Sequence, residues 1–148
     1  METQDCSCPS TMKERINDKI KEINMFLEEL ERFLPSSYEE YITDIKTKAA
    51  CERYFEKIIE ACVDLSFLVI KFKNFDVPQD DKGSFEILAK EGVINQETSQ
   101  KFKDAKGMRN ILAHEYGKVD DSIVHKAVTT KLIEDVSTLL TQLEKNIQ

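Results

Sequence analysis

The chain has 148 residues, about one domain, and its apolar residues are scattered among charged ones rather than gathered into a long run. Glycine (4) and proline (3) together make up about 5% of the chain, against roughly 12% in ordinary proteins. Sandwiches and barrels need frequent turns, so this composition excludes them and favours an all-α fold. The net charge of −7 argues against a surface that coats nucleic acid throughout, but it is compatible with a local basic patch.

The first predicted helix lies between Pro9 and Pro35. Apolar residues recur there at alternating spacings of four and three residues, which places them on one helical face. This stripe consists of Ile16, Ile20, Ile23, Leu27, Leu30 and Leu34. Ser36 and Ser37 are each followed three residues later by glutamate, a capping-box pattern. They predict a short helix that ends near Lys46.

A second stripe predicts a long central helix from about Thr47 to Lys73. Its members are Cys51, Phe55, Ile58, Cys62, Leu65, Val69 and Phe72. The helix is also apolar at Ile59 and Val63, so its apolar band is wider than one neighbouring helix covers. This width predicts contacts with several helices and leaves room for a second subunit.

The remaining predicted elements are also helical. Residues 74–83 are predicted as a loop, and a short helix from Ser84 ends at Gly92. Asn95 can cap the next helix, which continues towards Tyr116. The last helix begins after Asp120, and its stripe comprises Val128, Leu132, Val136, Leu139, Leu143 and Ile147. We therefore expect residues 13–148 to form one helical domain and residues 1–12 to form a flexible N-terminal tail.

The cysteines and the N-terminus indicate a reducing compartment. Cys51 and Cys62 are separated along the central helix by about 16 Å, too far for a disulfide or a shared metal ion, and both are predicted core residues. Cys6 and Cys8 lack a second ligand pair at zinc-site spacing. The first residues have no basic start and no apolar segment that would direct secretion. We expect a cytoplasmic protein that uses no metal or cofactor.

The segment from Lys101 to Lys118 differs in charge from the rest of the chain. It carries five basic residues against two acidic ones, a net charge of +3 in a chain of net charge −7. Arg109, His114 and Tyr116 lie within it, so groups suited to phosphate binding, proton transfer and base stacking are close in sequence. A structural interpretation is also open, in which the histidine is favoured by the helix dipole, the tyrosine packs and the arginine is solvated.

The spacing of these residues sets a geometric condition. On an ideal helix Arg109 and Tyr116 share a face, whereas His114 is rotated by about 140° from Arg109. Convergence of Arg109 and His114 on one phosphate requires a distorted helix end, helped by Gly107 or Gly117, or the same motif from a second chain. A twofold dimer cleft would satisfy the second condition.

The sequence Arg109-Asn-Ile-Leu-Ala-His114-Glu-Tyr116 matches an R-x4-H-x-Y signature, and the chain resembles the HepT family within the HEPN superfamily of helical ribonucleases. The segments 60–64, 85–94 and 107–116 resemble that family in the same order, and the likeness extends over roughly residues 20–145. The resemblance implies a homodimeric, antiparallel bundle of four to five helices that acts as the toxin of a toxin–antitoxin pair. It also implies a minimal nucleotidyltransferase partner, the antitoxin, which adenylylates Tyr116 and silences the nuclease.

The motif residues fit ribonuclease chemistry. RNA carries its own nucleophile, the 2′-OH, so a metal-free enzyme needs a proton shuttle and a cation for the charge of the phosphorane. His114 is the candidate shuttle, and Arg109 is the candidate brace for the phosphate. Asn110 can donate a further hydrogen bond, and Tyr116 can orient the substrate or stack on a base. The implied substrate is RNA, with tRNA as one candidate.

Two carboxylates one turn apart in the central helix, Glu60 and Asp64, are candidate supporting residues that orient His114 or Arg109. The alternative is an ordinary solvated or salt-bridged helix face, and it is favoured more for Glu60 than for Asp64. His125, in the last predicted helix, is interpreted as structural or solvent-facing.

Two other functions stay open from the sequence. One is a non-catalytic subunit that binds nucleotide or substrate and presents it to a nucleotidyltransferase, with the basic segment only docking phosphate. The other is a helical dimerisation module without a role in nucleic-acid chemistry. Cleavage of RNA in the absence of metal distinguishes the ribonuclease from both.

Overall fold

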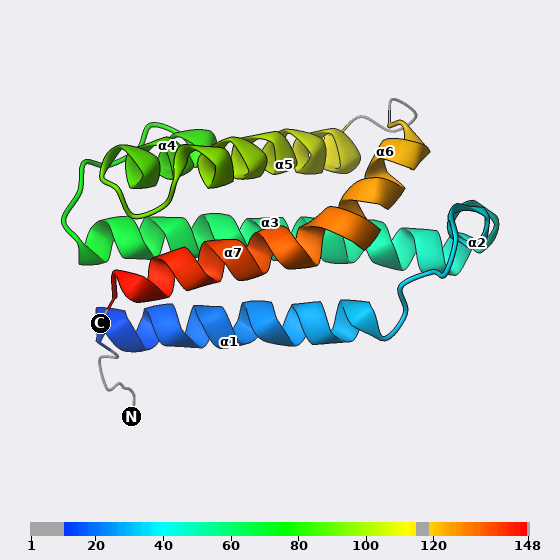
Figure 1. Ribbon diagram of the computed structural model, residues 1–148, viewed down its shortest axis with the longest axis horizontal. Coiled ribbons are helices and arrows are strands. Elements are labelled where there is room, and N and C mark those ends of the chain that lie inside the picture. The colour runs from blue at the N-terminus through cyan, green and yellow to red at the C-terminus, as the bar shows by residue number, and fades with distance from the viewer. Residues whose placement is uncertain (1–10, 115–118, 148) are drawn as a thin grey trace.

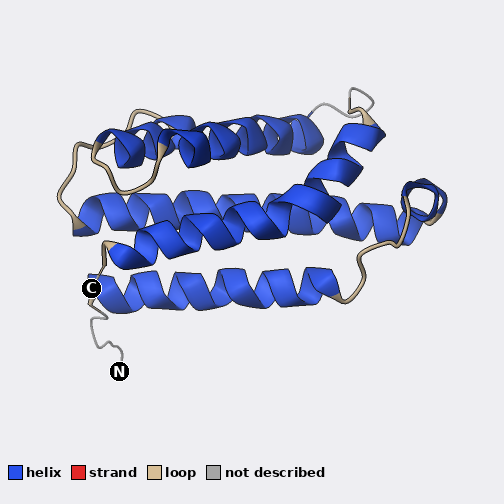
Figure 2. Cartoon of the chain, in the orientation of Figure 1, coloured by secondary structure: helices blue, strands red, loops and turns tan. Residues whose placement is uncertain are grey.

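The computed structural model describes residues 11–114 and 119–147, and this part of the chain is helical without any strand (Figures 1 and 2). The elements are α1 (Met12–Glu31), α2 (Tyr38–Thr43), α3 (Ile45–Phe72), α4 (Asp81–Lys90), α5 (Gln96–His114), α6 (Asp121–Lys126), a π-helical segment η1 (Ala127–Lys131) and α7 (Leu132–Lys145). In Figure 1 the helices α1, α3, α5 and α7 lie alongside one another, with α4 beside α5. The predicted all-α bundle is confirmed. None of the described helices has the length and apolarity that crossing a bilayer requires.

Thr11 determines where α1 begins. Its hydroxyl accepts a hydrogen bond from the Glu14 backbone N–H at 3.0 Å, and the Glu14 carboxylate accepts one from the Thr11 N–H at 2.8 Å. Of the predicted tail, residues 1–10, with Cys6 and Cys8, lie outside the described residues, and the remainder belongs to this helix start. The predicted stripe is buried from Ile16 to Leu30 and packs against α3, whereas Leu34 lies beyond the end of α1 and is only partly buried.

The short helix α2 ends at Thr43, before its predicted end near Lys46. Asp44 adopts extended backbone, and its carboxylate accepts hydrogen bonds from the backbone N–H groups of Lys46 and Thr47 at 3.1 and 3.2 Å. Asp44 therefore caps a new helix where the predicted one continued. The predicted boundary is wrong because a capping aspartate interrupts the helix there.

The central helix α3 packs against α1, α2, α4, α5 and α7. Its predicted stripe is buried from Cys51 to Val69, and Ile59, Val63 and Ile70 outside that stripe are buried as well. Neighbours within the same chain therefore account for the wide apolar band. The band by itself is no argument for a second subunit.

Both cysteines of α3 are buried free thiols. Burial raises the pKa of the Cys51 thiol to about 11 and raises the pKa of the Cys62 thiol well above its usual range. Both groups stay protonated at neutral pH, so neither is a nucleophile. Their predicted place in the core is confirmed.

The helix α4 begins at Asp81 rather than at the predicted Ser84. The cause is Asp80, whose carboxylate accepts a hydrogen bond at 2.7 Å from a backbone N–H in the first turn. The end of α4 agrees with the prediction, since Gly92 takes a positive φ of 78° just beyond it. Asn95 caps α5 as predicted, accepting a hydrogen bond at 2.8 Å.

The last predicted helix is divided into α6 and α7 by the π-helical segment η1. The hydroxyl groups of Thr129 and Thr130 donate to backbone carbonyl oxygens four residues earlier, at 2.7 and 2.6 Å. Such side-chain bonds compete with the α-helical ladder, and the wider turn accompanies a change of direction between α6 and α7 (Figure 1). The predicted stripe stays buried from Val128 to Leu143 across this bend.

His125 has a packing role. Its ring lies 5.3 Å from the ring of Tyr38 and 5.2 Å from that of Tyr41, measured between centroids. These contacts join α6 to α2, so the structural interpretation of His125 holds.

Candidate active site

The motif lies at the C-terminal end of α5. Arg109 and Asn110 are partly buried in this helix, and His114 is exposed in its last turn. Tyr116 lies outside the described residues. The groups predicted for phosphate binding and proton transfer, on Arg109 and His114, therefore lie in one short stretch of helix.

The described part of α5 is α-helical from Gln96 through Gly107 to His114. The distortion considered at Gly107 is therefore absent, and Gly117 lies outside the described residues. A regular helix holds Arg109 and His114 about 7.5 Å apart along its axis and about 140° apart around it. Within the described residues, one chain does not direct both side chains at the same point.

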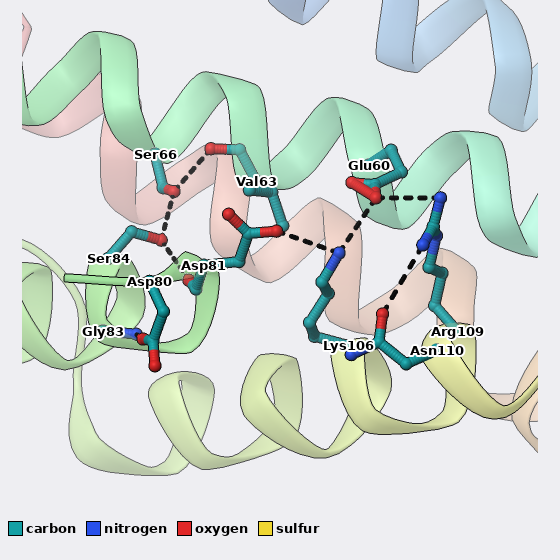
Figure 3. A network of polar contacts seen from close by, with 10 residues as sticks. All are labelled: Glu60, Val63, Ser66, Asp80, Asp81, Gly83, Ser84, Lys106, Arg109 and Asn110. Carbon is teal, nitrogen blue, oxygen red and sulfur yellow. Dashed lines mark hydrogen bonds and ion pairs between the residues drawn. The ribbon is translucent and has the colours of Figure 1, made fainter. Parts of the chain in front are cut away.

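Arg109 is held by Glu60 of α3. The guanidinium forms an ion pair with Glu60, with Nη2 3.0 Å from Glu60 Oε1, and the Arg109 side chain is 22% exposed (Figure 3). Nη1 makes only a long contact of 3.5 Å with the Asn110 side-chain oxygen. The buried Nε has no hydrogen-bond partner among the described residues. Glu60 thus orients the arginine that the sequence proposes as the phosphate brace, and leaves several of its donors free.

Lys106, which the sequence interpretation did not select as a site residue, joins the same carboxylate. Its Nζ lies 2.9 Å from Glu60 Oε1 and 3.0 Å from Asp81 Oδ2, and its side chain is only 7% exposed (Figure 3). In the sequence, the one indication that Lys106 belongs to the site is its position three residues before Arg109, which puts both cations near one face of α5. Its two partners come from α3 and α4, and the sequence pattern does not indicate them.

Asp64, the second predicted supporting carboxylate, contacts neither motif residue. It faces Lys19 of α1 at 3.7 Å, and its side chain is 62% exposed. Asp64 and Arg109 do line the same cavity of about 360 Å³ between α1 and α3. The salt-bridged alternative therefore describes Asp64, whereas Glu60 is salt-bridged to the motif itself.

The basic segment is electrically balanced by its neighbours. Lys101 pairs with Asp135 at 3.3 Å, and Lys103 pairs with Glu86 at 2.9 Å. Lys106 and Arg109 share Glu60, and Lys118 lies outside the described residues. Acids from α3, α4 and α7 thus face the described cations of this segment and offset its net positive charge.

Among residues 11–114 and 119–147, no three His, Cys, Asp or Glu side chains are grouped closely enough to hold a metal ion. A larger cavity of about 570 Å³ lies between α5 and the α6–α7 region, and neither Arg109 nor His114 lines it. An exposed imidazole and an oriented guanidinium are the groups that the motif offers to a substrate.

An all-helical bundle that carries an Arg-x4-His pair near the end of one helix is the arrangement expected of a helical ribonuclease. The chain belongs to the HepT-like family of that class, because the family model described as Ribonuclease HepT-like matches residues 23–145. It is therefore an enzyme of the ribonuclease type.

Individual relatives agree with this assignment. The mRNA nuclease HepT of Shewanella oneidensis is 32% identical over 71 residues, which cover 47% of this chain and 53% of that protein. The tRNA nuclease HepT of Aphanizomenon flos-aquae is 22% identical over 136 residues, covering 88% and 92%. The solved structure of the tri-AMPylated Shewanella oneidensis HEPN toxin in complex with MNT antitoxin matches with a TM-score of 0.82 and 23% identity, covering 93% of this chain and 99% of that one. At this identity the structural match shows the fold alone.

Proposed function

We propose that the protein is a metal-independent endoribonuclease, the toxin of a toxin–antitoxin pair in the cytoplasm. The observation that carries the proposal concerns the end of α5. There Arg109 forms an ion pair with Glu60 of α3, and His114 of the same α5 is exposed to solvent. The family match and the nuclease names of the relatives support the reaction type. Those relatives are named for mRNA and for tRNA, and RNA is accordingly the proposed substrate class.

The proposed chemistry uses the 2′-OH of RNA as the nucleophile. His114 accepts or donates the proton at the reacting oxygens, a role that its exposure permits. The free donors of Arg109 stabilise the additional negative charge that develops on the phosphorus oxygens. The Asn110 amide group supplies a further hydrogen bond.

We propose that two chains complete the site. Because α5 is regular, Arg109 and His114 of one chain lie on different faces of the helix. A twofold dimer in which the two α5 ends meet would place the arginine of one chain opposite the histidine of the other.

We further propose that a nucleotidyltransferase antitoxin controls the enzyme through Tyr116, which lies outside the described residues. The solved relative is a tri-AMPylated toxin in complex with MNT antitoxin, and this supports adenylylation as the means of control. An AMP group adds a bulky anion close to Arg109 in sequence. It would occupy the position of the RNA phosphate without any change of fold.

The decisive experiment measures RNA cleavage by the purified chain in EDTA. The wild type is expected to cleave, and His114→Ala is expected to lose about a hundredfold or more in rate, the usual contribution of general acid–base catalysis. His125→Ala serves as the matched control, since that imidazole packs on tyrosine rings. Dependence on a divalent ion, or full activity without His114, would refute the mechanism. An inactive wild type that binds nucleotide would support the non-catalytic subunit instead.

A further inference from the structure

Four charged side chains of alternating sign form a row across three helices, and we refer to Asp81, Lys106, Glu60 and Arg109 as the charge row (Figure 3). Asp81 comes from α4, Lys106 and Arg109 from α5, and Glu60 from α3. The successive contacts measure 3.0, 2.9 and 3.0 Å. Lys106 is the most enclosed member, with 7% of its side chain exposed against 44% for Asp81.

The two cations of the charge row compete for a single oxygen atom. Glu60 Oε1 accepts a hydrogen bond from Lys106 Nζ and forms an ion pair with Arg109 Nη2. A carboxylate that faces arginine alone favours two parallel hydrogen bonds, the fork geometry that neutralises a guanidinium most completely. The Nε of Arg109 is adjacent to Nη2, buried, and without a partner among the described residues. It is the donor that such a fork would use.

We propose that Lys106 is a positioning residue that keeps the charge of Arg109 available for a phosphate group of RNA. By binding Glu60, it shares the negative charge of that carboxylate and prevents fork pairing between Glu60 and Arg109. Lys106 acts through Glu60 and does not contact the RNA. This inference rests on the proposed function, and it adds the reason why a buried lysine lies beside the phosphate-binding arginine.

The test measures binding separately from cleavage. All variants are made in the full-length chain carrying His114→Ala, and the affinity for a fluorescein-labelled single-stranded RNA is measured by fluorescence anisotropy. Lys106→Met removes the charge while keeping the length of the side chain. It is expected to weaken RNA binding about tenfold, as a lost charge-assisted contact does. Lys103→Met is the matched control, because Lys103 lies one turn earlier in α5 and pairs with Glu86 outside the charge row.

A second substitution separates positioning from structural support. If Glu60 captures Arg109 when Lys106 is lost, removal of the Glu60 charge in the Glu60→Gln/Lys106→Met double variant should restore binding to within about threefold of the parent. A merely structural lysine would make the double variant weaker than either single one. Circular dichroism melting verifies that each variant is folded. If Lys106→Met does not fold, Lys106→Leu, which likewise cannot bind Glu60, replaces it with the same expectation.

The outcomes distinguish the two proposals. A wild type that neither binds nor cleaves RNA overturns the proposed function and the role of Lys106 with it. A wild type that cleaves RNA, with Lys106→Met binding as tightly as Lys103→Met, overturns the role of Lys106 alone. Weakened binding in Lys106→Met that the double variant fails to restore also overturns it.

Discussion

Individual ion pairs, rather than the net charge of residues 101–118, determine the electrostatic environment of Arg109. Each described cation between Lys101 and Arg109 faces a carboxylate within 4 Å. Arg109 differs from Lys101 and Lys103 because its acid is divided between two cations. On the proposed function, we therefore expect long-range attraction of RNA by this segment to be weak and recognition to depend on close contact with a small number of donors.

At the scale of single residues, Tyr116 is the predicted point of control. Co-expression with a nucleotidyltransferase partner is expected to add one or more adenylyl groups to the chain and to abolish RNA cleavage. Tyr116→Phe is expected to lose the mass increment together with the inhibition, because the phenolic oxygen is the acceptor. Intact-mass spectrometry measures the increment.

The matched control for this prediction is Tyr38→Phe, because Tyr38 of α2 is also accessible, with 40% exposure. The control tests whether loss of any accessible tyrosine would remove the modification. This control is expected to be modified and inhibited like the wild type. An unmodified chain that its partner still neutralises would mean that the antitoxin acts by covering the site.

At the scale of helices, α5 connects the structural and chemical parts of the molecule. Its middle contributes Phe102 and Lys106 to the interior, and its end presents Arg109 and His114. Continuity of the helix through Gly107 is what fixes the angle between those two functional side chains. A test of that continuity is therefore also a test of the dimer argument.

Gly107→Ala is expected to stabilise the protein. Alanine is favoured over glycine inside a helix by about 1 kcal/mol, which corresponds to a rise of roughly 2–4 °C in melting temperature for a domain of this size. The added Cβ would lie 3.4 Å from the Lys82 ammonium nitrogen, the end of a flexible side chain that can move aside. Thermal unfolding followed by circular dichroism measures the change. A clear loss of stability would mean that the helix is not regular at this position.

At the scale of the whole molecule, the central question is how many chains form one site. The bundle buries the wide apolar band of α3 within a single chain, so packing alone does not require a dimer. The angle between Arg109 and His114 is the feature from which we propose a dimer. Association of two chains at the ends of α5 would reconcile a well-packed monomer with a site built from separate faces.

Mixing two inactive variants tests this arrangement. Arg109→Ala and His114→Ala are each expected to lose cleavage activity as homodimers. If each site takes its arginine from one chain and its histidine from the other, a mixed dimer contains one intact site. Co-refolding the two variants in equal amounts should then restore roughly a quarter of the wild-type activity.

Light scattering on the wild type verifies the dimer, and each variant refolded alone is the control. No recovery on mixing, with dimers present, would mean that both residues of a site come from the same chain. A monomer at micromolar concentration would contradict the arrangement altogether.

The helices, their buried faces and the motif could be predicted because they depend on neighbours within a few residues. Spacings of three and four residues located α1, α3 and α7, and the signature from Arg109 to Tyr116 pointed to the family. The misplaced boundaries at Asp44 and Asp80 were also local. Both residues are capping aspartates whose side chains accept hydrogen bonds from backbone N–H groups of the following helix. The spacing of apolar residues does not indicate these hydrogen bonds.

The charge row was decided only by tertiary structure. Glu60 and Lys106 are 46 residues apart in the chain, and Asp81 joins them from a third helix. Local periodicity places a charged residue on a face of its own helix, but its partner depends on how the helices pack and which side chains the packing encloses. For the same reason the sequence indicated five cations in a basic segment, whereas the folded chain sets carboxylates against those that the structure describes. Ion pairs between helices form only after the apolar stripes have determined the packing.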